Sequence, residues 1–123
     1  MERRWSKGSF FFLHYKYTDS CGEDGDFEGK VKHIEEIDRH VPEILALEPD
    51  VLIVTGDHST PAALKGHSWH PVPVVISAET CRRDDVDCFS ELACAHGGLG
   101  RFDAKHLLPM ALAHAGKLAK YGA

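Results

Sequence analysis

The chain has 123 residues, and its 14 basic and 19 acidic side chains give a net charge of −5 with histidine neutral. Its 43% hydrophobic and 27% charged residues are typical of an ordinary globular protein and exclude a disordered or collagen-like chain. We expect residues 1–123 to form a single domain. No nucleic-acid partner is expected, because phosphate neutralisation needs a clustered basic surface and the basic clusters are only two Arg-Arg pairs, at 3–4 and 82–83.

The sequence gives no sign of membrane insertion or secretion. No apolar run approaches the roughly 20 residues of a membrane-spanning helix, and the run at 10–13 is shorter than the roughly 7 residues of a signal-peptide core. The cysteines form no C-x-x-C motif, so we expect reduced thiols and a cytoplasmic protein. Three of the four, Cys81, Cys88 and Cys94, are expected to be buried and inert.

Residues 9–17 predict a strand, because they are rich in aromatic side chains and contain no Gly or Pro. His14 and Lys16 would share one face of that strand. The polar, glycine-containing residues 18–26 then predict a loop.

A helix is predicted from Phe27, where apolar residues begin to recur three or four positions apart. Asp26 is the predicted N-cap, and the helix should end near Leu47, because Pro49 disfavours helical geometry in the residue before it. Residues 51–54 form a continuous apolar run, which is typical of a strand buried on both faces of a parallel sheet.

The second half of the chain predicts another strand and two helices. The strand covers residues 72–77, and the helices cover 89–96 and 103–121, the second divided or kinked by Pro109 and closed by Gly122. This order predicts an α/β fold with a mainly parallel sheet flanked by helices.

Three polar clusters follow or precede the predicted strands: Asp19 with its acidic neighbours, the pair Asp57 and His58, and residues 67–70. In open parallel sheets the ligand site lies beyond the carboxyl ends of the strands, so these clusters should meet at one rim. Carboxylates and imidazoles that converge on one point are typical ligands of divalent metals such as Mn²⁺ or Zn²⁺.

Each cluster also has a purely structural interpretation. Aspartates after a strand are often turn residues or helix N-caps, which explains Asp19, Asp24 and Asp26 equally well. Lys16 is a candidate phosphate ligand, but a lysine on a strand also serves to discourage edge pairing. The remaining histidines are expected on solvated faces or at helix ends.

Four segments, residues 18–27, 50–61, 67–73 and 120–123, together resemble the archaeal-type cofactor-independent phosphoglycerate mutases of the alkaline phosphatase superfamily. The resemblance implies a partial alkaline-phosphatase-like core and the C-terminal, metal-binding part of a longer enzyme. That enzyme would convert 3-phosphoglycerate to 2-phosphoglycerate in glycolysis without 2,3-bisphosphoglycerate.

The resemblance also implies two metal sites. One would use Asp19, Glu23 and His67, and the other would use Asp57 and His58 together with an Asp and a Ser that this chain does not match. That Ser is the family's nucleophile, so the chain alone is expected to be inactive. Many relatives carry His where Glu23 stands, and a carboxylate there, or from Asp24 instead, would favour Mn²⁺ over softer ions.

Two other functions fit the same residues. One is a noncatalytic metal-binding or interaction module, and the other is a piece of a different phosphohydrolase of the superfamily. In either case, open strand edges and uncovered apolar surface predict a homo-oligomer or a complementing N-terminal chain.

Overall fold

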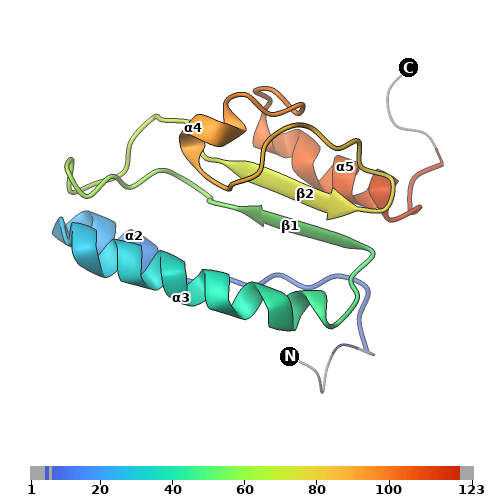
Figure 1. The fold of residues 1–123 in the computed structure, drawn as a ribbon, viewed down its shortest axis with the longest axis horizontal. Coiled ribbons are helices and arrows are strands. Elements are labelled where there is room, and N and C mark those ends of the chain that lie inside the picture. The colour runs from blue at the N-terminus through green and yellow to red at the C-terminus, as the bar shows by residue number, and fades with distance from the viewer. Residues whose placement is uncertain (1–4, 6, 120–123) are drawn as a thin grey trace. The chain divides into compact units, whose positions relative to one another are not determined.

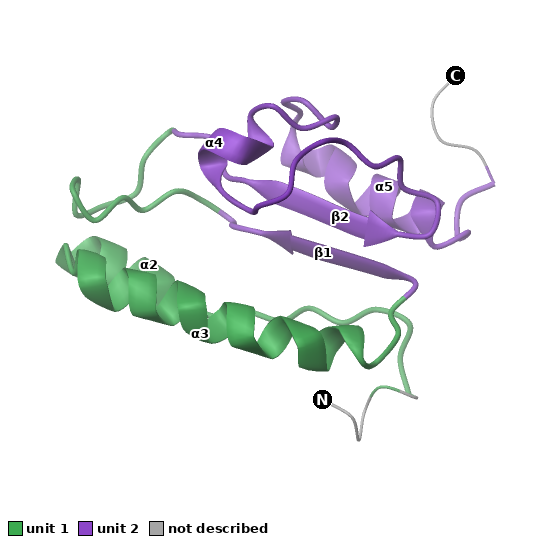
Figure 2. Cartoon of the chain, viewed as in Figure 1, with its two compact units in different colours: residues 1–49, 58–69 green, residues 50–57, 70–123 purple. Residues whose placement is uncertain are grey.

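The computed structural model describes residue 5 and residues 7–119 (Figure 1). The chain divides into two compact units: residues 1–49 with 58–69 form unit 1, and residues 50–57 with 70–123 form unit 2 (Figure 2). The arginine pair at 3–4, the motif at 120–123 and the predicted helix end at Gly122 lie outside the described residues.

Unit 1 contains the long helix that the sequence predicts. Helix α3 spans Phe27–Leu45, and the carboxylate of Asp26 caps it by accepting a hydrogen bond of 2.9 Å from the backbone N–H of Gly29. The predicted start and N-cap are confirmed, and the helix ends two residues before the predicted position.

The predicted strand over 9–17 and loop over 18–26 are wrong. Residues 9–16 form no strand, so His14 and Lys16 share no strand face, and helix α2 occupies Tyr17–Asp24. The helix ends at Gly25, whose φ of 76° suits glycine. Packing explains the difference, because Gly22 is buried against Thr60 and lacks the side chain that would prevent this approach.

Unit 2 contains a two-stranded sheet. Strand β1 (Val51–Thr55) pairs with β2 (Val74–Ala78) in antiparallel orientation, with Val51 opposite Ala78. The mixture of helices and strands confirms the α/β class, but the predicted parallel sheet is wrong. Neighbouring parallel strands usually require a helical crossover, and residues 56–73 contain no helix.

The helices of unit 2 are shorter than the sequence predicts. Helix α4 covers only Glu91–Cys94, and a 3₁₀ turn at Ala104–His106 leads into α5, Leu107–His114. Pro109 does not divide α5, because it lies in the first turn, where its missing N–H has no intrahelical partner to lose.

None of the hydrophobic residues in the described part of the chain is buried. Trp69 and Leu92 are 84% and 83% exposed. All four cysteines are free, but the prediction that three are buried is wrong, since Cys88 is exposed and Cys81 and Cys94 are half-buried. Across the described residues, no helix combines the length and apolar character needed to cross a membrane.

A hydrogen-bonded cluster joins the segment before α2 to α3 within unit 1. The Tyr15 hydroxyl donates to Glu36 Oε2 at 2.6 Å and lies 2.7 Å from His33 Nδ1, and the Tyr17 ring stacks on His33. The Glu36 hydrogen bond raises the pKa of Tyr15 to about 12, and the same bond lowers the pKa of Glu36.

We expect the difference in tyrosinate absorbance between the wild type and Tyr15→Phe to titrate with a midpoint near pH 12. The folded pKa is raised, so the stabilising hydrogen bond is intact below pH 10 and is lost as the pH rises through about 12. Glu36→Gln should return the Tyr15 midpoint toward 10. A wild-type midpoint already near 10 would show that the carboxylate does not hold this proton.

Candidate metal centre

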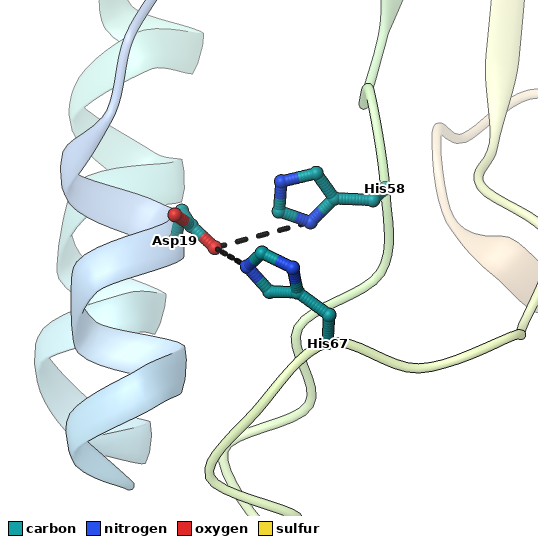
Figure 3. Close-up of side chains that lie close together, drawn as sticks. All are labelled: Asp19, His58 and His67. Carbon is teal, nitrogen blue, oxygen red and sulfur yellow. Dashed lines mark ion pairs between the residues drawn. The ribbon is translucent and has the colours of Figure 1, made fainter.

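Three potential metal ligands meet in unit 1 (Figure 3). Asp19 lies in the first turn of α2, and His58 and His67 come from the connection of residues 58–69. An isolated antiparallel bridge between Ser59 and Ser68 closes this connection, with the Ser68 N–H donating to the Ser59 carbonyl at 2.8 Å. Both histidines directly flank the bridge, so the backbone holds them side by side.

The three side chains are close enough to share an ion. Asp19 Oδ1 lies 3.5 Å from His67 Nε2 and 3.9 Å from His58 Nδ1, and the two imidazole rings have centroids 3.9 Å apart. One ligand atom from each residue falls within 4.8 Å of the others. The Asp19 side chain is 17% exposed and that of His67 is 55% exposed, so the group lies open to solvent on the His67 side.

The donor set fits a divalent cation. Metal bonds to imidazole nitrogen and carboxylate oxygen measure about 2.0–2.2 Å, so two ligands of one ion lie at most about 4.4 Å apart. Atoms within 4.8 Å of one another reach that spacing through side-chain shifts of a few tenths of an ångström. Two imidazoles with one carboxylate suit Zn²⁺ and Mn²⁺ alike.

Asp19 is held in its ionised form. The Thr60 hydroxyl donates to Asp19 Oδ1 at 2.7 Å, and Lys16 Nζ donates to Oδ2 at 3.1 Å. These contacts, the Thr60 hydrogen bond first, lower the pKa of Asp19. A carboxylate kept ionised and fixed at both oxygens is ready to accept a cation.

Two of the other predicted site residues also lie in unit 1. Glu23 follows Asp19 by one helical turn, and its Oε1 lies 3.6 Å from His67 Nε2, although its side chain is half exposed. Lys16 occupies the N-cap position of α2, where it pairs with Asp19. Its predicted contact with a substrate phosphate stays a prediction.

The remaining predicted ligand, Asp57, is the last residue of the 50–57 segment of unit 2 and directly precedes His58. It is not part of the group that Asp19, His58 and His67 form. Thr60 was not among the predicted site residues, although it is 4% exposed and contacts both Asp19 and His58. Its position two residues after His58, within the motif at 50–61, could have indicated that it lies at the site.

The chain is similar over its whole length to longer curated proteins. It is 54% identical over 123 residues to the probable 2,3-bisphosphoglycerate-independent phosphoglycerate mutase of Thermotoga neapolitana, and covers 31% of that protein. A protein of the same name from Thermus thermophilus is 53% identical, with 30% covered. The chain thus spans under a third of the length of these relatives, and the predicted resemblance to part of such a mutase is confirmed.

A solved structure and a family model agree with these matches. The structure of the PH0037 protein from Pyrococcus horikoshii superposes with a TM-score of 0.85 at 38% identity, over 91% of this chain and 35% of that one. The model of the Metalloenzyme superfamily matches residues 3–114, a span that includes every candidate ligand. The chain therefore belongs to the Metalloenzyme superfamily, whose members use a divalent metal.

Proposed function

We propose that this chain is the metal-binding part of a cytoplasmic 2,3-bisphosphoglycerate-independent phosphoglycerate mutase, which interconverts 3-phosphoglycerate and 2-phosphoglycerate. The observation that carries the proposal is the meeting of Asp19, His58 and His67 in a chain that is 54% identical throughout to proteins of that name. The chain spans about 31% of those relatives, so the activity belongs to the longer protein.

Asp19, His58 and His67 would hold a divalent ion, with Glu23 as a further ligand. Asp57 stays the proposed ligand of the second ion that the family resemblance implies. When bound, such an ion neutralises charge on phosphoryl oxygens and lowers the pKa of a hydroxyl nucleophile. Lys16 would place its ammonium group near the phosphoryl group, since it pairs with Asp19 and its side chain is 65% exposed.

Mn²⁺ is the proposed ion. Two carboxylates, Asp19 and Glu23, lie beside His67, and oxygen-rich sites favour Mn²⁺ over softer competitors. Zn²⁺ is the second candidate, because two imidazoles and one carboxylate also form a common zinc donor set. Competition between the two ions in calorimetry would rank them.

The catalytic nucleophile would come from the part of the relatives that this chain does not match. The same part would cover the apolar side chains of this chain, since none in the described residues is buried and exposed apolar surface of this extent marks an interaction face. A symmetric homodimer is the alternative cover. Light scattering of the chain alone and of the longer protein would distinguish them.

We expect His67→Ala to weaken Mn²⁺ binding by at least about tenfold. Removing even a hydrogen-bond partner of a metal ligand typically lowers the metal affinity 10–100-fold, and His67 is a proposed ligand itself. His40→Ala is a matched control, because His40 is 60% exposed on α3 and pairs with Glu43 away from the group. Calorimetric titration of the three chains measures the effect. Equal Mn²⁺ affinity in the wild type and His67→Ala would show that His67 is not a ligand. The meeting of Asp19, His58 and His67 would then no longer support the proposed function.

A further inference from the structure

Thr60 is the buried polar residue of the described chain, at 4% exposure, and contacts from α2 and α3 fix its backbone. Lys30 of α3 donates from Nζ to the Thr60 carbonyl at 2.6 Å. Gly22 of α2 packs directly against the same carbonyl and against the Thr60 methyl group. The position of this residue is therefore set before any ion binds.

The Thr60 hydroxyl lies between two candidate ligands. Its oxygen is 2.7 Å from Asp19 Oδ1 and 3.0 Å from His58 Nδ1. A hydroxyl carries one hydrogen, and an ionised carboxylate can only accept a hydrogen bond. The Thr60 hydroxyl therefore donates its hydrogen to Asp19. The contact with His58 then requires the imidazole to donate from Nδ1 to the hydroxyl oxygen.

We infer that Thr60 is the positioning residue of this centre: it orients Asp19 and, while no ion is bound, holds His58 in the Nδ1–H tautomer. The inference rests on the metal centre of the proposed function and adds to it the residue that holds two of its ligands in place. Hydrogen bonds to a fixed partner commonly set the orientation of the side chains at a metal centre. Here the partner of His58 is a hydroxyl already polarised by the Asp19 carboxylate.

The tautomer can be read in the metal-free 123-residue chain by long-range ¹H–¹⁵N correlation at a pH where the His58 ring is neutral. His58→Gln assigns the signal among the nine histidines. We expect the Nδ1–H pattern in the wild type and in Thr60→Ser, and its loss in Thr60→Val, which keeps the shape but removes the hydroxyl. A wild-type ring protonated at Nε2 would overturn the inference without any variant being needed.

The second readout is Mn²⁺ affinity by calorimetry. Thr60→Val should bind roughly 10–100-fold more weakly, and Thr60→Ser should stay close to the wild type. Thr55→Val is the matched control, because it removes a hydroxyl that donates to the Pro73 carbonyl in unit 2. Unchanged affinity in Thr60→Val would overturn the role of Thr60. A wild type that binds no Mn²⁺ would instead refute the proposed metal centre, while the tautomer would still decide how Thr60 acts on His58.

Discussion

Gly22→Ala should lower the free energy of unfolding by about 1–3 kcal/mol, the usual cost of overpacking a filled site. Alanine is normally favoured over glycine inside a helix. At this position, however, the new methyl group would overlap the Thr60 backbone carbonyl and lie 3.0 Å from the Thr60 methyl and 3.1 Å from Lys30 Nζ. Denaturant unfolding and Mn²⁺ titration of the variant would both report the displacement of Thr60.

Gly66→Ala is the matched control for this substitution. Gly66 belongs to the same unit, and an added methyl group there would have its nearest neighbour, the Leu64 carbonyl, at an ordinary 3.9 Å. We expect this variant to be as stable as the wild type or slightly more stable. Equal stability of the two alanine variants would mean that α2 does not pack on Thr60 as described.

The second prediction concerns catalysis. The 123-residue chain with Mn²⁺ should form no 2-phosphoglycerate from 3-phosphoglycerate above a metal-only blank, because it carries no residue that matches the family's nucleophile. A chimera that joins this chain to the remaining part of the Thermotoga neapolitana relative should regain activity, since the chain is 54% identical to the segment that it would replace. The loss or gain is all-or-none in an enzyme-coupled assay.

Two chimeras serve as controls for that assay. Asp19→Asn removes the negative charge of a proposed ligand, and the chimera should then lose activity. His40→Ala leaves the group intact and should keep it. Turnover by the isolated chain would place the nucleophile among residues taken here as structural, and phosphate release without isomerisation would favour a phosphohydrolase over a mutase.

The elements that the sequence predicts well are those with local causes. Helix α3 has an apolar period and a capping carboxylate at Asp26, and β1 is a short run of apolar residues. Both signals are contained within the element itself, so neighbouring parts of the chain do not have to be known.

The missed elements depend on distant contacts. Helix α2 has a polar, glycine-containing sequence that is typical of a loop, and its buried glycine is explained only by Thr60, which lies 38 positions later. The antiparallel pairing of β1 and β2 likewise depends on how residues 56–73 return, which periodicity does not show. Tertiary packing overrides local preference in both cases.

The elements that carry the candidate site differ from those that the sequence predicts. Two parallel strands were expected to bring the polar clusters to one rim, but Asp19 is carried by a helix and His58 and His67 by a bridged connection. The residue types and the family resemblance selected these three positions independently of the elements that carry them. Thr60 was missed because a threonine has no distinctive chemistry until its hydroxyl partners are known.

The lack of buried hydrophobic residues in the described chain also bears on its thermodynamics. Transfer of apolar surface from water is the main source of the heat-capacity change on unfolding, which is normally about 12–15 cal/mol/K per residue. A chain that keeps its apolar side chains in contact with solvent has a smaller value, and its free energy of unfolding therefore curves less with temperature. If the longer protein buries those side chains, as proposed above, its heat-capacity change per residue should be larger than that of this chain.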